Sequence, residues 1–231
     1  MRCIQSDIQS YYFKGLQTLI QALHEINQQK FAWSIVKLYY STFYLLRCDI
    51  LLSNHILVKC QTLYYCKPIK DIKFSKFTGK TRGDHQNTIV FAEKLYKESE
   101  LNDPIFGNYI DDQNPYLWLL QQRERVNYRL KDFSDPMHDE VFDHTITYFK
   151  ENDLFNLFLF YQNDKEYTSC FDTDHSILAI PLKKLFQISS KIKKRMPNSE
   201  IDIKKVANCS RMLKDLNIGK QEILSLLNNI P

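Results

Sequence analysis

With 231 residues, the chain is long enough for one sizeable core with an appendage, or for two small domains. Its 5 glycines, against 14 tyrosines and 15 phenylalanines, argue against a glycine-rich phosphate loop or a many-turned β architecture and favour long helices. No stretch approaches the roughly 18 to 20 unbroken apolar residues of a membrane span. The opening "MRCIQSDIQS" also lacks the apolar region of a secretory signal. The six cysteines have no zinc-site spacing, so we expect free thiols in a reducing cytoplasm.

The charge is distributed unevenly. Of the 31 basic and 27 acidic residues, 11 basic and 3 acidic ones lie between Ile177 and Lys220, which gives that segment a net charge of +8. The rest of the chain has 20 basic and 24 acidic residues and a net charge of −4. A basic C-terminal piece on a mildly acidic body suggests an anionic partner.

Two long helices are predicted in the first part of the chain. The first begins at Ser6 or Asp7, either of which can cap it, and carries an apolar stripe at helical spacing. The second runs from Phe31 to about Leu52, and its segment "LYYSTFYLL" is apolar enough to be buried on more than one side. Because only a few polar residues join the two helices, we expect them to be antiparallel neighbours.

The helical period is lost in residues 54–83, which we interpret as an extended or hairpin insertion. A third helix is predicted from about Asp84. The fourth has a clear start, because Asn114 is a good N-cap and Pro115 suits the first helical position. It is expected to end around Leu130.

A similar start signal, Ser134-Asp135-Pro136, predicts a fifth helix with acidic first turns. After Asn152 the segments "LFNLFLFY", "YTSCF" and "SILAIPL" suggest extended structure or a short hairpin. Helices then follow at about 182–194, 202–216 and 220–227. We therefore expect a mainly α fold with two parts: a four- or five-helix bundle over 1–152 and a small basic α(+β) domain over 153–231.

The stretch "LLQQRERVNYRLKDF" at the end of the fourth helix contains a candidate site. Its candidate residues are Arg123, Arg125, Asn127, Tyr128 and Arg129. Arg125 shares a helix face with Tyr128 and Arg129, whereas Arg123 points differently, and Asn127 loosens a helix. These residues can form a polar site for a phosphate or an RNA backbone. By composition alone they are better explained as an ordinary solvated helix face, in which Arg123 pairs with solvent or with acids of the fifth helix and Tyr128 caps the core.

Histidines give a second set of candidates. Glu140 and His144 lie one helical turn apart beside His138, but no third ligand is spaced to join them, so no metal site is predicted. His85, which follows "TRGD", is expected in the first turn of the third helix. There it is either a structural residue or a proton-transfer group.

The basic C-terminal segment mixes an apolar stripe with closely spaced cations. As candidates for nucleic-acid binding we name Lys183, Lys184, Lys191, Lys193, Lys194 and Arg195. Charges this dense repel one another unless an anion relieves them, which favours contact with a phosphate backbone. A solvated helix face packed on the body explains the pattern equally well.

Three stretches in this order resemble the HEPN superfamily of helical domains in prokaryotic toxin–antitoxin, defence and RNA-processing proteins. "AWSIVKLYYSTFYLLRCDILL" is similar to the family's A-x-Y-Y-x-x-F helix, and "GDHQNTIVFAEKL" to its His-containing helix start. "RERVNY" is similar to the ending R-x-R-A-D-Y. The resemblance covers residues 6 to 150 and leaves the C-terminal part outside.

The resemblance implies a homodimer whose two motifs face each other. In active members an Arg, four to six residues and a His cut RNA without metal or cofactor, the ribose 2′-hydroxyl attacking its own phosphate. On this chain Arg123 matches the arginine and Tyr128 takes the place of the histidine. A tyrosine, with an ordinary pKa of about 10, is a poor general base at neutral pH. Arg123 or Arg125 would then stabilise phosphate charge, Asn127 would orient it, and His85 would have to move the proton.

The leading hypothesis is therefore a cytoplasmic, dimeric, HEPN-like RNA-binding protein of a defence or toxin–antitoxin system, with metal-independent RNA cleavage left open. A second hypothesis is a non-catalytic subunit that holds a neighbour-encoded partner enzyme, such as a nucleotidyltransferase or a nuclease. A third is a module in which only the C-terminal helices bind nucleic acid. Neither a cofactor nor a membrane is expected.

Overall fold

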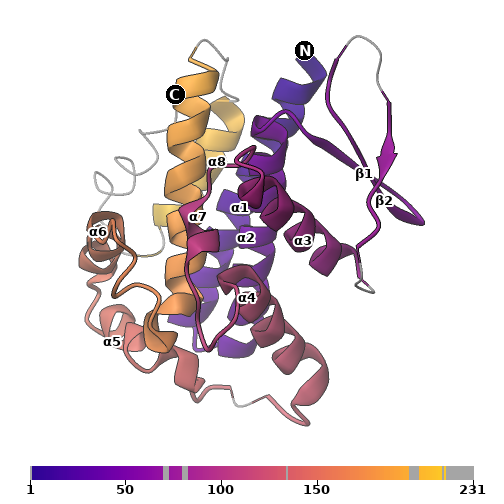
Figure 1. Cartoon of the computed structure of the whole chain (residues 1–231). Helices are drawn as coiled ribbons and strands as arrows, with labels where there is room; N and C mark the ends of the chain where they lie inside the picture. The colour runs from indigo at the N-terminus through magenta and orange to yellow at the C-terminus, as the bar shows by residue number, and fades with distance from the viewer. Residues whose placement is uncertain are drawn as a thin grey trace.

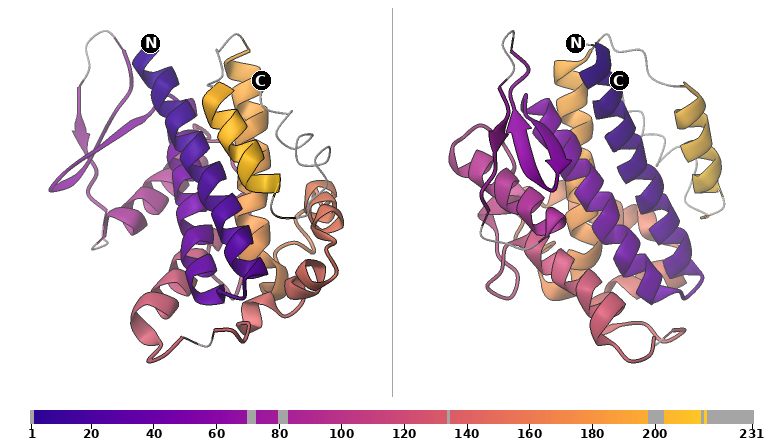
Figure 2. Two further views of the ribbon diagram at one scale, coloured as in Figure 1. Left: turned by 180° about the vertical axis from the view of Figure 1, so that it is seen from behind. Right: turned by 90° about the vertical axis from the view of Figure 1, so that its right-hand side faces the viewer.

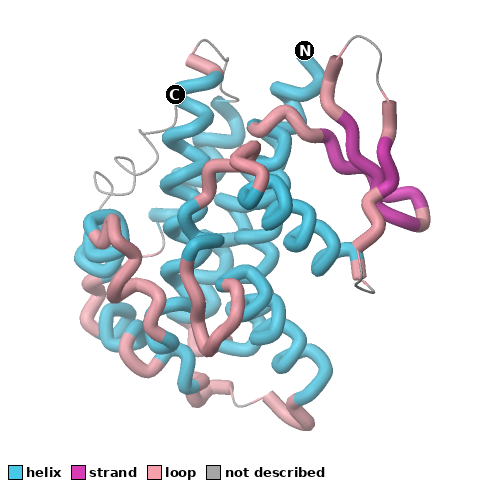
Figure 3. Tube along the Cα trace, viewed as in Figure 1, coloured by secondary structure: helices cyan, strands magenta, loops and turns pink. Residues whose placement is uncertain are grey.

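The computed structural model describes residues 2–69, 73–79, 83–133, 135–197, 203–214 and 216, and the fold is mainly helical (Figures 1 and 3). The helices are α1 (Arg2–Asn27), α2 (Phe31–Leu52), α3 (Asp84–Lys97), α4 (Pro115–Glu124), α5 (Thr145–Lys150), α6 (Leu154–Asn163), α7 (Thr173–Arg195) and α8 (Ile203–Lys214). The strands are β1 (Ile56–Cys60), β2 (Thr62–Cys66) and β3 (Ser75–Lys76). Short helical turns lie at η1 (Pro104–Gly107), η2 (Arg125–Arg129) and η3 (Glu140–Phe142).

Helices α1 and α2 form the predicted hairpin and pack closely along their length (Figure 2). α1 begins at Arg2, before the predicted start at Ser6 or Asp7. Gly15 permits the close approach of the two helices, because a Cβ there would lie 2.7 Å from Leu45 Cγ. At the same point Ser41 Oγ donates a hydrogen bond of 2.8 Å to the Gly15 carbonyl. As predicted, α2 is buried on more than one side.

Helix α7 packs against α2, so the C-terminal part of the chain shares the core of the first part (Figure 1). Buried residues from α1, α2, α4, α6 and α7 belong to one hydrophobic cluster. Extended structure was predicted for "LFNLFLFY" and "SILAIPL", and this prediction was wrong, because both stretches are helical. In α6 the buried residues Leu154, Leu157, Phe158 and Tyr161 have helical spacing, and α7 starts at Thr173 and continues through the buried Pro181. The expected helix at 220–227 lies outside the described residues.

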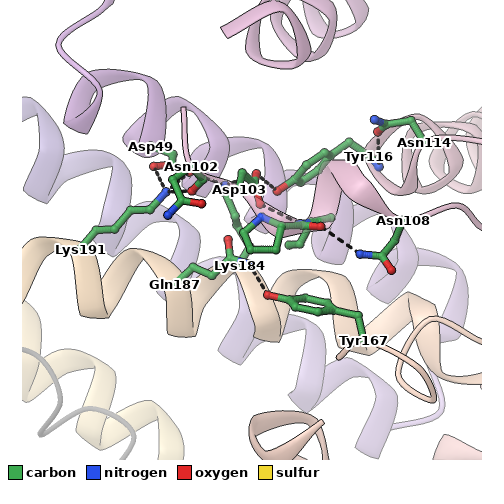
Figure 4. A network of polar contacts seen from close by, with 12 residues as sticks. Asp49, Asn102, Asp103, Asn108, Asn114, Tyr116, Tyr167, Lys184, Gln187 and Lys191 are labelled. Carbon is green, nitrogen blue, oxygen red and sulfur yellow. Dashed lines mark hydrogen bonds and ion pairs between the residues drawn. The ribbon is translucent and has the colours of Figure 1, made fainter. Parts of the chain in front are cut away.

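A buried polar network fixes α7 to α2 and η1 (Figure 4). The fully buried Lys184 of α7 donates bonds of 2.6 Å to both Asp49 of α2 and Asp103. Asp103 also accepts from the Tyr116 hydroxyl at 2.5 Å, and Lys191 contacts Asp49 at 2.6 Å. Two carboxylates therefore neutralise two ammonium groups where an unpaired charge would be costly.

The insertion at 54–83 forms a small antiparallel sheet in the order β1-β2-β3. It lies over α3 beside the bundle (Figure 1). The ring of Phe91 on α3 meets Tyr65 at 4.9 Å and Phe77 at 5.3 Å between ring centroids. This packing anchors the sheet next to the start of α3, where His85 lies.

The start of α4 is as predicted: Asn114 accepts a 2.9 Å hydrogen bond from the Tyr116 amide, and Pro115 is the first helical residue. The start of the fifth helix was predicted wrongly, because α5 begins at Thr145. Ser134 lies outside the described residues. The carboxylate of Asp135 instead accepts a 3.1 Å hydrogen bond from the Ala32 amide in the first turn of α2.

Candidate functional site

Helix α4 runs directly into a π-helical turn, η2, and Arg123 is the next-to-last residue of α4. A π turn displaces the side chains that follow it and is often found at functional sites. The Arg123 guanidinium carbon lies 5.6 Å from the ring centroid of Tyr40, 5.8 Å from Tyr39 and 5.4 Å from Tyr128. Its Nη2 donates to the Tyr40 hydroxyl at 3.2 Å. Arg123 is thus held by two tyrosine rings of α2 and by the ring of Tyr128 in η2.

The described residues leave part of the Arg123 guanidinium without a partner. None of their carboxylates lies within ion-pair distance of it, and its Nε is buried without a hydrogen bond to them. Burial is the largest single influence and acts to lower the pKa of Arg123, but the hydrogen bond to Tyr40 and the neighbouring tyrosines together outweigh it, and the net direction is upward. The group is a permanent cation with free hydrogen-bonding capacity.

His85, in the first turn of α3, lies against the same two tyrosines. Its Nδ1 is 2.7 Å from the Tyr39 hydroxyl, and its ring stacks on Phe43 with centroids 4.3 Å apart. The ring centroid is 5.6 Å from both Tyr39 and Tyr40. Burial, followed by the charge of Arg123, lowers the pKa of His85. The imidazole is therefore neutral at physiological pH.

The hydrogen on His85 can be placed from its partner. Burial raises the pKa of Tyr39, so that hydroxyl keeps its proton. The hydroxyl has no other hydrogen-bond partner in the described part of the chain, so its hydrogen is satisfied by donation to His85 Nδ1. The imidazole hydrogen then lies on Nε2, which makes His85 a neutral hydrogen-bond donor.

We call Arg123, Tyr128, Tyr39, Tyr40 and His85 the tyrosine–arginine cluster. It brings together three residues that the sequence singled out, Arg123, Tyr128 and His85, from two distant segments. The two tyrosines of α2 were missed, because Tyr39 fits the apolar stripe of the helix. The signal was present in "LYYSTFY", where adjacent tyrosines leave one hydroxyl at the edge of the core.

The other arginines do not join the cluster. Arg125 pairs with Asp139 at 2.7 Å and donates to Gln122 at 3.1 Å, so its charge is already used. Arg129 is exposed, and Asn127 is half-buried. Of the three arginines of this stretch, only Arg123 therefore lies in the cluster. The alternative that Arg123 pairs with an acid after α4 is not observed, because the acid Asp139 pairs with Arg125 instead.

Four of the six cations named as nucleic-acid-binding candidates have partners within the protein, and for the fully buried Lys184 this corrects the expected contact with nucleic acid. Lys184 is fully buried, and Lys191 pairs with Asp49. Lys183 is buried and donates to the Asp164 carbonyl, while Arg195 donates to the Leu52 carbonyl. Lys193 and Lys194 are exposed at the end of α7.

The remaining histidine candidates form separate pairs. His138 lies 3.0 Å from Asp143, and His144 lies 3.4 Å from Asp174. Within the described ranges there is no group of three or more side chains able to hold a metal ion. The helices of those ranges include none that is both long and apolar enough to span a membrane.

Comparison with known proteins gives no relative: no protein-family model, no curated protein and no solved structure matches this chain. The function must therefore be argued from the geometry and chemistry of the cluster.

Proposed function

We propose that this protein binds RNA through the tyrosine–arginine cluster, as a HEPN-like, homodimeric, cytoplasmic component of a prokaryotic defence or toxin–antitoxin system. The observation that carries the proposal is Arg123, a cation held between tyrosine rings without a carboxylate partner in the described part of the chain. A guanidinium suits phosphate oxygens, and exposed aromatic rings suit unpaired bases. Tyr128, 72% exposed, offers such a ring beside the cation.

RNA binding is supported better than RNA cleavage. Metal-free cleavage needs a group that takes the proton from the ribose 2′-hydroxyl. With Nδ1 occupied by Tyr39 and the hydrogen on Nε2, His85 donates to a phosphate oxygen or a leaving group and does not accept that proton. We therefore propose binding as the principal activity and treat cleavage as a second readout.

The test is the binding of a labelled single-stranded oligoribonucleotide, measured by fluorescence anisotropy over a range of salt concentrations. Arg123→Gln is expected to weaken binding about tenfold and to reduce the salt slope by about one, because one phosphate contact is lost. Arg123→Lys, which keeps the charge but not the planar group, should recover part of the affinity. The same reactions, run with a chelator, are examined for fragments with 2′,3′-cyclic phosphate ends.

The matched control is Arg211→Gln, on the exposed side of α8. It should bind RNA as wild type does, with circular dichroism showing that both variants are folded. If Arg123→Gln binds RNA as tightly as wild type, the proposal is wrong. Loss of affinity in Arg211→Gln alone would transfer the binding function to the C-terminal helices.

A second candidate function, a subunit that holds a partner protein, is favoured by exposed apolar side chains near the start of α2. Trp33 is 52% exposed, and its ring lies 6.3 Å from that of Phe133, which is 51% exposed. Leu130 and Met137 are exposed in the same segment after η2. Such side chains are typical of interaction sites. Reconstitution of a complex from this protein and a purified product of an adjacent gene, disrupted by Trp33→Ser with Phe133→Ser, would support this candidate.

A further inference from the structure

A second group of cations and aromatic rings lies on α1 and α2, away from Arg123. Lys14 Nζ is 5.8 Å from the Tyr11 ring centroid and 6.0 Å from that of Tyr44. The Arg47 guanidinium lies 5.5 Å from the same Tyr11 ring and donates to the Tyr11 hydroxyl at 3.3 Å. Lys14 is exposed and the other three side chains are partly exposed. This group repeats the pattern of the tyrosine–arginine cluster.

The two groups are continuous along α2. Tyr40 of the cluster and Tyr44 of the second group have ring centroids 6.2 Å apart and planes inclined by 31°. Tyr40, Tyr44 and Arg47 follow one another at spacings of four and three residues, so they lie on one helix face. From Tyr40 to Arg47 that face extends about 10 Å. Cations and rings therefore alternate from Tyr128 and Arg123 to Tyr11 and Arg47.

The charges of this surface are available to an anion. In the described part of the chain no carboxylate forms an ion pair with Lys14, Arg47 or Arg123. Asp7 borders a small hollow beside Tyr11 and Arg47 but is not within ion-pair distance. Asp84 lies 3.6 Å from Lys59, without a hydrogen bond to it, and its charge also acts on His85. A surface of this sign attracts a phosphate backbone.

The alternation of rings and cations distinguishes between possible polyanions. In a duplex the bases are stacked on one another and offer no free faces to tyrosines, whereas a single strand offers both base faces and phosphates. A protein interface is also enriched in Tyr and Arg but is depleted in Lys, whereas here the exposed Lys14 lies by two tyrosine rings. On this surface each of the three cations lies within 6 Å of the centroid of at least one tyrosine ring.

We propose that the tyrosine–arginine cluster and the group Tyr11, Lys14, Tyr44 and Arg47 form one track for single-stranded RNA. The inference rests on the proposed function and adds the strand state of the ligand and a second binding region. Bases stack on the exposed tyrosine faces, and Lys14, Arg47 and Arg123 contact successive phosphates. A short oligonucleotide occupies the Arg123 end, and a longer one extends over Lys14.

The test compares oligoribonucleotides of about 4 and about 12 nucleotides. Both lengths lie within the range of site sizes of aromatic-lined grooves, the first at its lower end. Lys14→Gln combined with Tyr44→Leu is expected to weaken binding of the long strand about tenfold and to leave the short strand unchanged. Arg123→Gln should weaken both. Lys14→Glu, at an exposed position where folding is not at risk, should weaken the long strand at least as much. Lys97→Gln with Tyr109→Leu, two exposed positions outside the track, is the matched control.

The outcomes separate the two proposals. If the long strand binds the Lys14 and Tyr44 variants as tightly as wild type while Arg123→Gln weakens it, the track is excluded and the proposed function stands. If no RNA binds the wild-type protein, or if Arg123→Gln has no effect, both are excluded. Equal affinity for a duplex of the same length would overturn the assignment to single strands.

Discussion

Several neighbouring charges act on the protonation of His85. The positive charges of Arg123, Lys59 and Arg47 act against protonation of its ring, and the carboxylate of Asp84 acts in favour of it. Burial adds to the first effect and is the largest cause of the lowered pKa. The negative charge of an incoming phosphate would favour the protonated ring, so RNA binding should raise the pKa of His85.

The lowered pKa makes the free energy of unfolding depend on pH. In the unfolded chain His85 returns to its ordinary pKa of 6.5, so acid protonates the unfolded state first. The contribution of His85 to stability is fully present above pH 6.5 and is lost as pH falls from 6.5 through the folded-state pKa. We expect the fall in melting temperature between pH 7.5 and about 5 to be smaller in His85→Gln than in wild type. An equal fall in both proteins would contradict this account.

At the scale of elements, local rules predicted most of the first half of the chain. The bounds of α2 and the cap of α4 follow from apolar period and from Asn114-Pro115, which are properties of neighbouring residues. The start of α7 did not follow, because Pro181 is a helix breaker in water but here packs in the core. The role of Lys184 depends on Asp49 and Asp103, which are 135 and 81 residues away, so no local pattern shows it.

The same distinction applies to the candidate site. The helix motifs singled out Arg123, Tyr128 and His85 one by one, but the sequence did not indicate that Tyr39 and Tyr40 bring His85 next to Arg123. It did not indicate that Arg125 would be neutralised by Asp139. That pairing depends on the path of the chain after η2, where the predicted helix start at Ser134 was wrong.

Lys184 provides the prediction at this scale. Lys184→Met is expected to lower the free energy of unfolding by about 3 to 5 kcal/mol, because Asp49 and Asp103 remain buried with one ammonium group fewer. Lys193→Met, an exposed position on the same helix, should change it by less than about 0.5 kcal/mol. Urea denaturation followed by circular dichroism measures both. Adding Asp49→Asn and Asp103→Asn to Lys184→Met should recover part of the loss, and similar values for the two single lysine variants would exclude the network as a source of stability.

In the whole molecule, α2 separates the buried charges from the candidate RNA surface. Asp49 follows Tyr40 by about two and a half helical turns, so the two residues lie on opposite faces of the helix. One face is joined to α7 through Lys184, and the other carries Tyr40, Tyr44 and Arg47. The C-terminal part therefore supports the site from behind, and two of the lysines expected to touch RNA, Lys184 and Lys191, hold α2 in place.

This arrangement predicts how a truncated chain behaves. Removal of residues 153–231 takes away α7, uncovers the apolar side of α2, and deprives Asp49 of both Lys184 and Lys191. It also removes the 2.9 Å hydrogen bond between Ser189 and the Tyr12 hydroxyl of α1. We expect the 1–152 fragment to lose cooperative thermal unfolding and to bind a hydrophobic dye, as expanded states with exposed cores do. Co-expression of 153–231 as a separate chain should restore cooperative unfolding and abolish dye binding, since it returns the missing side of the core. A cooperative transition in the isolated 1–152 fragment would instead support the division at residue 152 that the composition suggests.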